Sequence, residues 1–140
     1  MNPDDLQQLG AAFAARDPEA VRRAMWEINL SPGFRAEGSR YAAFEEMATA
    51  LPAPAPVIVQ QMRACGLHDT SERLGAISNP TLVIHGTVDR LIGVDNGRLI
   101  ASLLPESARL ELLEDVGHLF WWEQPERSAA LIREHAQAPV

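Results

Sequence analysis

Two stretches decide the fold, "NPTLVIHGTVDRLIG" at residues 79–93 and "ARLELLEDVGHLFWWEQPE" at residues 108–126. Each holds a short apolar run that ends in a turn, a pattern typical of a strand covered on both faces of a parallel sheet. The intervening residues 94–104 have helical spacing and stop at Pro105, and Pro125 opens a last helix. The order β-α-β-α predicts a right-handed crossover unit of a parallel α/β sheet.

The apolar spacing in these two helices predicts which side chains face the core. In the first helix we expect Leu99, Ile100 and Leu103 to point inward. In the last helix the same reasoning selects Ala129 and Ile132.

The earlier part of the chain predicts helices alone. One helix starts at residues 2–4 and a second at residues 17–19, because each triplet offers a capping residue, a proline suited to the first turn and an acid that favours the helix dipole. A third helix follows Ser39, with an inner face that runs from Tyr41 through Phe44 to Leu51.

A proline-rich segment, "PAPAP" at residues 52–56, predicts a stiff connector without helix. A fourth helix is expected over residues 57–64. The change of pattern near residue 70 predicts two regions, residues 1–69 and residues 70–140.

Composition excludes several classes of protein. The hydrophobic fraction of 46% is enough for a packed core, and the net charge of −7 argues against nucleic-acid binding. The single cysteine, Cys65, fits a reducing compartment. The N-terminal residues lack the apolar segment of a signal peptide, and no apolar run reaches the ~20 residues needed to cross a bilayer. We therefore expect a cytoplasmic protein that binds neither nucleic acid nor membrane.

Asp89 and His118 are the candidate catalytic residues, because each follows the carboxyl end of one of the two strands. Ligands of parallel sheets bind at that edge, where a carboxylate can hold a histidine in one tautomer and stabilise its cation. Either residue taken alone is better explained by a turn or by the end of a strand. The pair, at equivalent positions after two strands, points to acid–base chemistry.

Other candidates have simpler explanations. His85 is expected to be a packed or hydrogen-bonded core residue, and Cys65 an inert thiol. Ser39 and Asp95 stand at helix starts, where capping explains them. No spacing of His, Cys, Asp and Glu indicates a metal site.

With these residues in view, the stretches 79–93 and 108–126 resemble the C-terminal half of an α/β-hydrolase. The resemblance implies that Asp89 is the triad acid, that His118 is the general base, and that residues 1–69 form a helical cap. It also implies a hydrolase of small ester-like substrates without cofactor or metal, similar to the esterase, lactonase, perhydrolase and prolyl-aminopeptidase group. Phe120 and Trp121 either pack in the core or form a wall of the substrate pocket.

The sequence departs from that family in one respect, since it contains no Gly-x-Ser-x-Gly motif. We therefore expect the nucleophilic serine and the oxyanion hole to lie outside these residues, and this chain alone to be inactive. The sequence leaves open whether it comes from a split gene, with an N-terminal hydrolase half on another chain as its partner, from a truncated reading frame or from a fragment of a longer protein. The alternative is a non-catalytic interaction module that keeps the hydrolase architecture. A third hypothesis is an unrelated α/β binding domain in which Asp89 and His118 are structural.

Overall fold

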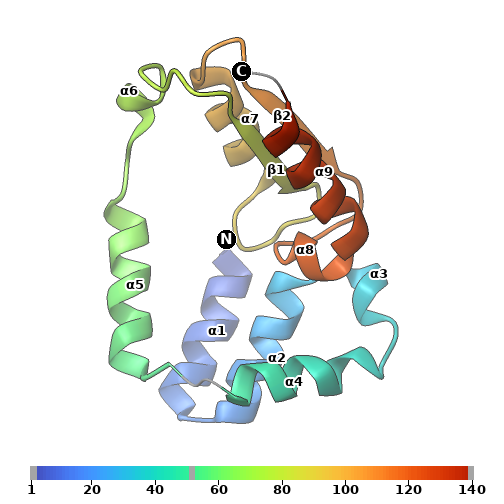
Figure 1. Ribbon diagram of the computed structural model, residues 1–140. Coiled ribbons are helices and arrows are strands. Elements are labelled where there is room, and N and C mark those ends of the chain that lie inside the picture. The colour runs from blue at the N-terminus through green and yellow to red at the C-terminus, as the bar shows by residue number, and fades with distance from the viewer. Residues whose placement is uncertain (1–2, 51–52, 139–140) are drawn as a thin grey trace.

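The computed structural model describes residues 3–50 and 53–138, so the predictions for Asn2, Leu51 and Pro52 lie outside the described residues. Helices alone occupy the chain before residue 70, and a β-α-β unit with further helices follows (Figure 1). The elements are α1 (Pro3–Ala15), α2 (Pro18–Asn29), α3 (Pro32–Arg35), α4 (Arg40–Ala50), α5 (Ala55–Leu67), α6 (Ser71–Leu74), β1 (Leu82–Gly86), α7 (Val94–Leu103), β2 (Arg109–Leu113), α8 (Phe120–Glu123) and α9 (Pro125–Gln137). The division into two domains near residue 70 stays a prediction.

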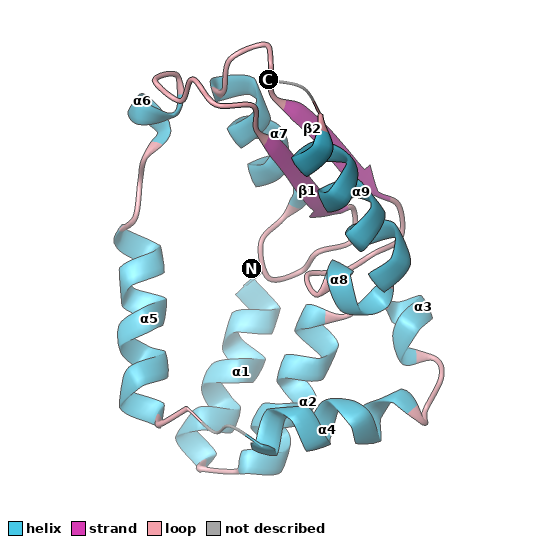
Figure 2. Ribbon diagram, viewed as in Figure 1, coloured by secondary structure: helices cyan, strands magenta, loops and turns pink. Residues whose placement is uncertain are grey.

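The two strands form a parallel pair, with Leu82 opposite Arg109 and Gly86 opposite Leu113. Alternate side chains of a strand point to opposite faces. Leu82 and Ile84 pack against the cluster around Leu131 of α9, whereas the ring of His85 lies against Gly97 of α7. The sheet therefore lies between α7 and α9 (Figure 2), as expected for part of an α/β-hydrolase sheet.

The predicted inner faces of α7 and α9 are wrong in part. Leu99 and Ile100 are 54% and 40% exposed, while the buried residue of α7 is Gly97. In α9, Ile132 is 54% exposed and Ala129 is also exposed, whereas Ser128 and Leu131 are buried. The prediction followed the apolar residues, but the buried positions of these two helices include a glycine and a serine.

The helices before residue 70 pack through two apolar clusters. Leu9, Ala24 and Ile28 join α1 to α2, and Trp26, Leu30 and Phe44 join α2 to α4. The ring of Trp26 meets the rings of Tyr41 and Phe44 edge-on, with centroids 5.5 and 5.3 Å apart. The predicted inward positions of Tyr41 and Phe44 are confirmed.

The capping signals are borne out at α2, where Oδ1 of Asp17 accepts hydrogen bonds from the backbone of Glu19 and Ala20 at 3.0 Å. The predicted connector is wrong at its end, because α5 already includes residues 55 and 56. Proline is compatible with the first helical turn, where its missing N–H would have had no partner in the helix.

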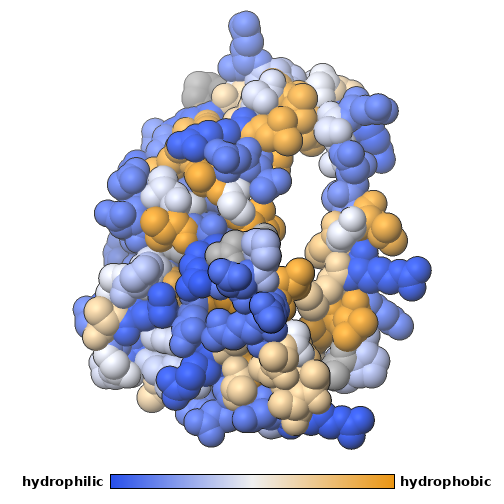
Figure 3. All heavy atoms as spheres, turned by 180° about the vertical axis from the view of Figure 1, so that it is seen from behind, coloured by the Kyte–Doolittle hydropathy of each residue, from blue (hydrophilic) through white to orange (hydrophobic). Residues whose placement is uncertain are grey.

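The chain exposes much more surface than a compact protein of its size. Its accessible surface is 9430 Å², whereas a compact monomer of 15.3 kDa exposes ~7,100 Å². Helix α5 buries none of its described side chains and leaves Val59, Met62 and Leu67 exposed. Figure 3 shows an opening bordered by hydrophobic side chains. The helices thus surround space that this chain does not fill.

Candidate active site

The turn after β1 and the loop after β2 are joined by backbone hydrogen bonds. The N–H groups of Thr87 and Val88 donate to Leu113 O and Val116 O at 3.0 and 3.1 Å. Gly86 is required at this contact, because a Cβ there would lie 2.2 Å from Val116 O and 2.4 Å from the carbonyl oxygen of Gly117. These contacts fix the turn that carries Asp89 against the loop that carries the candidate histidine.

Asp89 is buried in this turn, with only 4% of its side chain exposed. Its Oδ1 accepts hydrogen bonds from the backbone N–H groups of Leu91 and Ile92, both at 2.9 Å. Such a local turn fixes the carboxylate plane and leaves Oδ2 for other partners. Asp89 therefore stabilises its own turn, as expected of an isolated aspartate, but it does so with only one of its two carboxylate oxygens.

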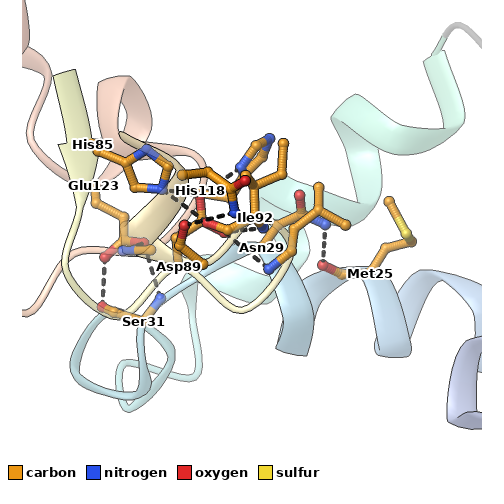
Figure 4. Close-up of polar contacts among 12 residues, drawn as sticks. Met25, Asn29, Ser31, His85, Asp89, Ile92, His118 and Glu123 are labelled. Atoms are coloured by element: carbon orange, nitrogen blue, oxygen red, sulfur yellow. Dashed lines mark hydrogen bonds and ion pairs between the residues drawn. The ribbon is translucent and has the colours of Figure 1, made fainter. Parts of the chain in front are cut away.

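Oδ2 of Asp89 lies 2.8 Å from Nδ1 of His118, as Figure 4 shows. An ionised carboxylate only accepts hydrogen bonds, so Nδ1 carries the proton of the neutral ring and donates a hydrogen bond to Asp89. Nε2 is then the basic nitrogen, and it makes no hydrogen bond with the residues that the structure describes. This arrangement can accept a proton at Nε2 and stabilise the resulting cation.

A second histidine contacts the same carboxylate. Nε2 of His85 lies 2.8 Å from Ile92 O and 3.4 Å from Oδ2 of Asp89. Because a carbonyl oxygen is only an acceptor, this Nε2 carries a proton and donates to it. His85 is the hydrogen-bonded residue that we expected, but its approach to Asp89 had no sequence signal apart from its position four residues earlier.

Phe120 and Trp121 follow the histidine loop at the start of α8, where their rings meet edge-on with centroids 5.1 Å apart. Phe120 packs beside the buried cluster of Leu113 and Leu131. Trp121 is 52% exposed, and its ring lies edge-on to that of His118, with centroids 6.5 Å apart. Their role as pocket walls stays a prediction, for which Trp121 is the better placed.

A cavity of about 880 Å³ opens among the helices before residue 70 and reaches the histidine loop at Leu119. Its wall is largely apolar and comes from α1, α2, α4 and α5, with Phe13, Val21, Met25 and Phe44 among its members. Volumes of a few hundred to about 1,000 Å³ are typical of small-molecule sites. The cavity therefore offers an apolar chamber that reaches the residue after His118, whereas Asp89 and His118 themselves do not line it.

The acid turn is also tied to α1. Arg90, next to Asp89, forms an ion pair with Asp5, and Nε of Arg90 lies 3.1 Å from Oδ2 of Asp5. Asp5 is only 1% exposed. No sequence pattern indicated this contact, since an aspartate in the first turn of a helix is explained by the helix dipole alone.

The remaining candidates lie away from the pair. Asp95 is exposed in the first turn of α7 and pairs with Arg98, Ser39 directly precedes α4, and Cys65 is an exposed free thiol on α5. Within residues 3–50 and 53–138, no group of His, Cys, Asp and Glu is arranged to hold a metal ion. Among the helices of these ranges, none combines the length and apolarity that a membrane span requires.

The chain is similar to known hydrolases. Over 61 residues it is 39% identical to a 2-hydroxy-6-oxononadienedioate/2-hydroxy-6-oxononatrienedioate hydrolase of Paraburkholderia xenovorans, a match covering 43% of this chain and 20% of the relative. A Thermogutta terrifontis esterase structure superposes with a TM-score of 0.73 at 25% identity, over 98% of this chain and 51% of the esterase. A Mycobacterium tuberculosis protein described as a non-heme bromoperoxidase gives a TM-score of 0.79 at 21% identity, over 100% of this chain and 55% of that protein.

The chain therefore spans about half the length of these solved structures and a fifth of the curated relative. The model of the alpha/beta hydrolase family matches residues 1–131, nearly the whole chain, including both loops of the candidate site. The chain belongs to the alpha/beta hydrolase family.

Proposed function

We propose that Asp89 and His118 act as the acid and the base of a hydrolase triad whose serine lies outside these 140 residues. The observation that carries the proposal is the 2.8 Å contact between Asp89 Oδ2 and His118 Nδ1, on a ring whose Nε2 makes no hydrogen bond within the described part of the chain. The completed enzyme hydrolyses an ester or a similar carbonyl compound of small size. The largely apolar cavity favours an apolar acyl or alcohol group.

In this mechanism Nε2 of His118 removes the hydroxyl proton of the serine as its oxygen attacks the substrate carbonyl. The protonated ring then gives this proton to the leaving alcohol, and an acyl-enzyme remains. A water molecule attacks the acyl-enzyme in turn, with His118 taking its proton and returning it to the serine. Throughout, Asp89 holds Nδ1–H and stabilises the positive charge of the ring.

The partner that we propose is the N-terminal half of a hydrolase core. One edge of β1 pairs with β2, while the other edge makes no strand pairing among the described residues. The surface in excess of a compact monomer is ~2,300 Å², and the side chains of α5 that contribute to it include Val59 and Met62. An added strand along β1 would satisfy its backbone groups, and its supporting layer would cover these apolar side chains.

The test is covalent labelling with a fluorophosphonate probe, which reacts with activated serines. This chain would be co-expressed with the N-terminal half of a related hydrolase that carries the Gly-x-Ser-x-Gly motif. We expect label on the serine of that half only when this chain is present, and loss of label with His118→Ala. A stable complex that labels equally well with His118→Ala would reject the proposed role.

A second candidate function, a non-catalytic interaction module, is favoured by the exposed apolar side chains of α5. Such side chains suit a permanent protein interface whether or not catalysis occurs. The same experiment separates the two functions, because the module would form the complex without activating any serine toward the probe.

A further inference from the structure

The carboxylate of Glu123 joins three segments of the chain next to the candidate base. Its Oε1 accepts hydrogen bonds from the backbone N–H groups of Gly117 and Ser31, both at 2.9 Å. Its Oε2 accepts from the hydroxyl of Ser31 at 2.5 Å. Glu123 belongs to α8, Gly117 directly precedes His118, and Ser31 caps α3, so a single side chain connects the histidine loop to the helical region (Figure 4).

The backbone on the other side of the histidine is attached to the same region. The N–H of Leu119 donates to Asn29 O at 3.1 Å. The approach at Gly117 is close, since a Cβ there would lie 2.7 Å from Oε1 of Glu123 and 2.8 Å from Asn29 O. The residues before and after His118 are thus both held at the end of α2, and the imidazole extends from a backbone fixed on each side.

We propose that Glu123 is a positioning residue, which sets the backbone at Gly117 so that Nδ1 of His118 meets Oδ2 of Asp89. The proposal rests on the function proposed above, in which this contact orients the base. Of the three hydrogen bonds that Glu123 accepts, the one from Gly117 N–H acts on the peptide unit next to the histidine. Without an acceptor at the Oε1 position, Gly117 can move away from Ser31 and carry the ring away from Asp89.

Replacing Glu123 by glutamine separates the effect of its hydrogen bonds from the effect of its charge. In Glu123→Gln the amide oxygen can occupy the Oε1 position and accept from both backbone N–H groups. Its amide nitrogen would face the hydroxyl of Ser31, which can turn to accept a hydrogen bond. Glu123→Ala removes every acceptor, and Glu123→Asp keeps the charge on a side chain one methylene shorter.

The test observes the imidazole of His118 directly, by nuclear magnetic resonance of the isotope-labelled 140-residue chain. In the parent chain we expect a slowly exchanging Nδ1-bound proton of His118 and nitrogen shifts of a single neutral tautomer. Glu123→Ala should abolish the protected proton and mix the tautomers, while Glu123→Gln should retain both signals. The matched control is Glu106→Gln, an exposed residue before β2, which should leave the signals unchanged.

A carboxylate that served stability alone would lower the melting temperature when removed but leave the ring signals in place. A protected His118 proton in a folded Glu123→Ala chain would therefore overturn the proposal. If that variant has no cooperative melt, Glu123→Asp carries the same test, because its shorter side chain cannot reach Gly117 and Ser31 together. Loss of the ring signal in either variant, together with a complex of the parent chain that shows no ester hydrolysis, would support the positioning role and reject the proposed function.

Discussion

Asp89 and His118 are 29 residues apart in the sequence, yet Oδ2 of the first and Nδ1 of the second lie 2.8 Å apart. The contact follows from the fold, because parallel strands present their carboxyl ends at one edge of a sheet. Backbone hydrogen bonds between the two following loops then reduce the separation to that of a hydrogen bond. A large separation of these side chains would have favoured the hypothesis of an unrelated domain, but they are in contact, and the match to the alpha/beta hydrolase family over residues 1–131 contradicts that hypothesis.

Replacing Asp89 by asparagine tests the acid. In a complex completed with an N-terminal hydrolase half, Asp89→Asn should lower kcat about ten-thousand-fold, because the ring loses its preferred tautomer and its counter-charge. The matched control is Asp95→Asn, at an exposed carboxylate in α7, and it should leave kcat nearly unchanged. Both values of kcat are measured by steady-state ester hydrolysis. Equal losses of kcat in the two variants would show that negative charge near the site, and not the contact between Asp89 and His118, is required.

Gly86→Ala tests the close approach of the two loops. The added Cβ would meet two backbone carbonyl oxygens at 2.2 and 2.4 Å, and neither can move without opening the loop contact. We expect a loss of about 3 kcal/mol in the free energy of unfolding, at the upper end of the range for overpacking. Gly93→Ala is the control, since nothing lies within 4 Å of its added Cβ. Urea unfolding that gives the same midpoint for both variants would contradict the requirement for glycine.

The observed face of α9 can be checked by two truncations one residue apart. Leu131→Ala should lower the free energy of unfolding by about 2–5 kcal/mol, because the leucine is completely buried against the sheet. Ile132→Ala should cost no more than about 0.5 kcal/mol, because that side chain is 54% exposed. Both free energies can be measured by thermal unfolding. A larger loss for Ile132→Ala than for Leu131→Ala would show that the face predicted from the sequence pattern is the buried one.

Without a partner, the chain should associate with itself or bind apolar dyes. Its described surface includes the exposed side chains of Val59, Met62 and Leu67 on α5. Val59→Lys should reduce dye fluorescence without lowering the melting temperature, since that residue is 62% exposed. A monodisperse chain with little dye binding, seen by light scattering and fluorescence, would argue against an unfilled surface.

Sequence patterns predicted the elements that depend on local chemistry. Asp17 and Pro18 placed the start of α2, and the apolar run before Gly86 placed β1, because capping groups and strand patterns act over a few residues. The short helix α3 was missed, although Ser31 and Pro32 carry the same start signal as Asp17 and Pro18.

The sequence could not predict contacts set by tertiary packing. From the sequence, Glu123 is simply a polar residue before a helix. No nearby residue indicates its contact with Ser31, which lies 92 residues earlier. Arg90 and Asp5, which form an ion pair, are likewise 85 residues apart in the sequence. Asp89 and His118 could be paired because strand ends converge by a general rule, whereas these contacts depend on how the helical region sits on the sheet.

The measurement that tests the central claim most directly is ester hydrolysis by this chain co-purified with the N-terminal half of a related hydrolase. We predict turnover by the complex, none above background by this chain alone, and a loss of about a million-fold in kcat with His118→Ala, the scale found when a triad base is removed. Hydrolysis by the complex that is unaffected by His118→Ala would contradict the account, as would hydrolysis by this chain alone.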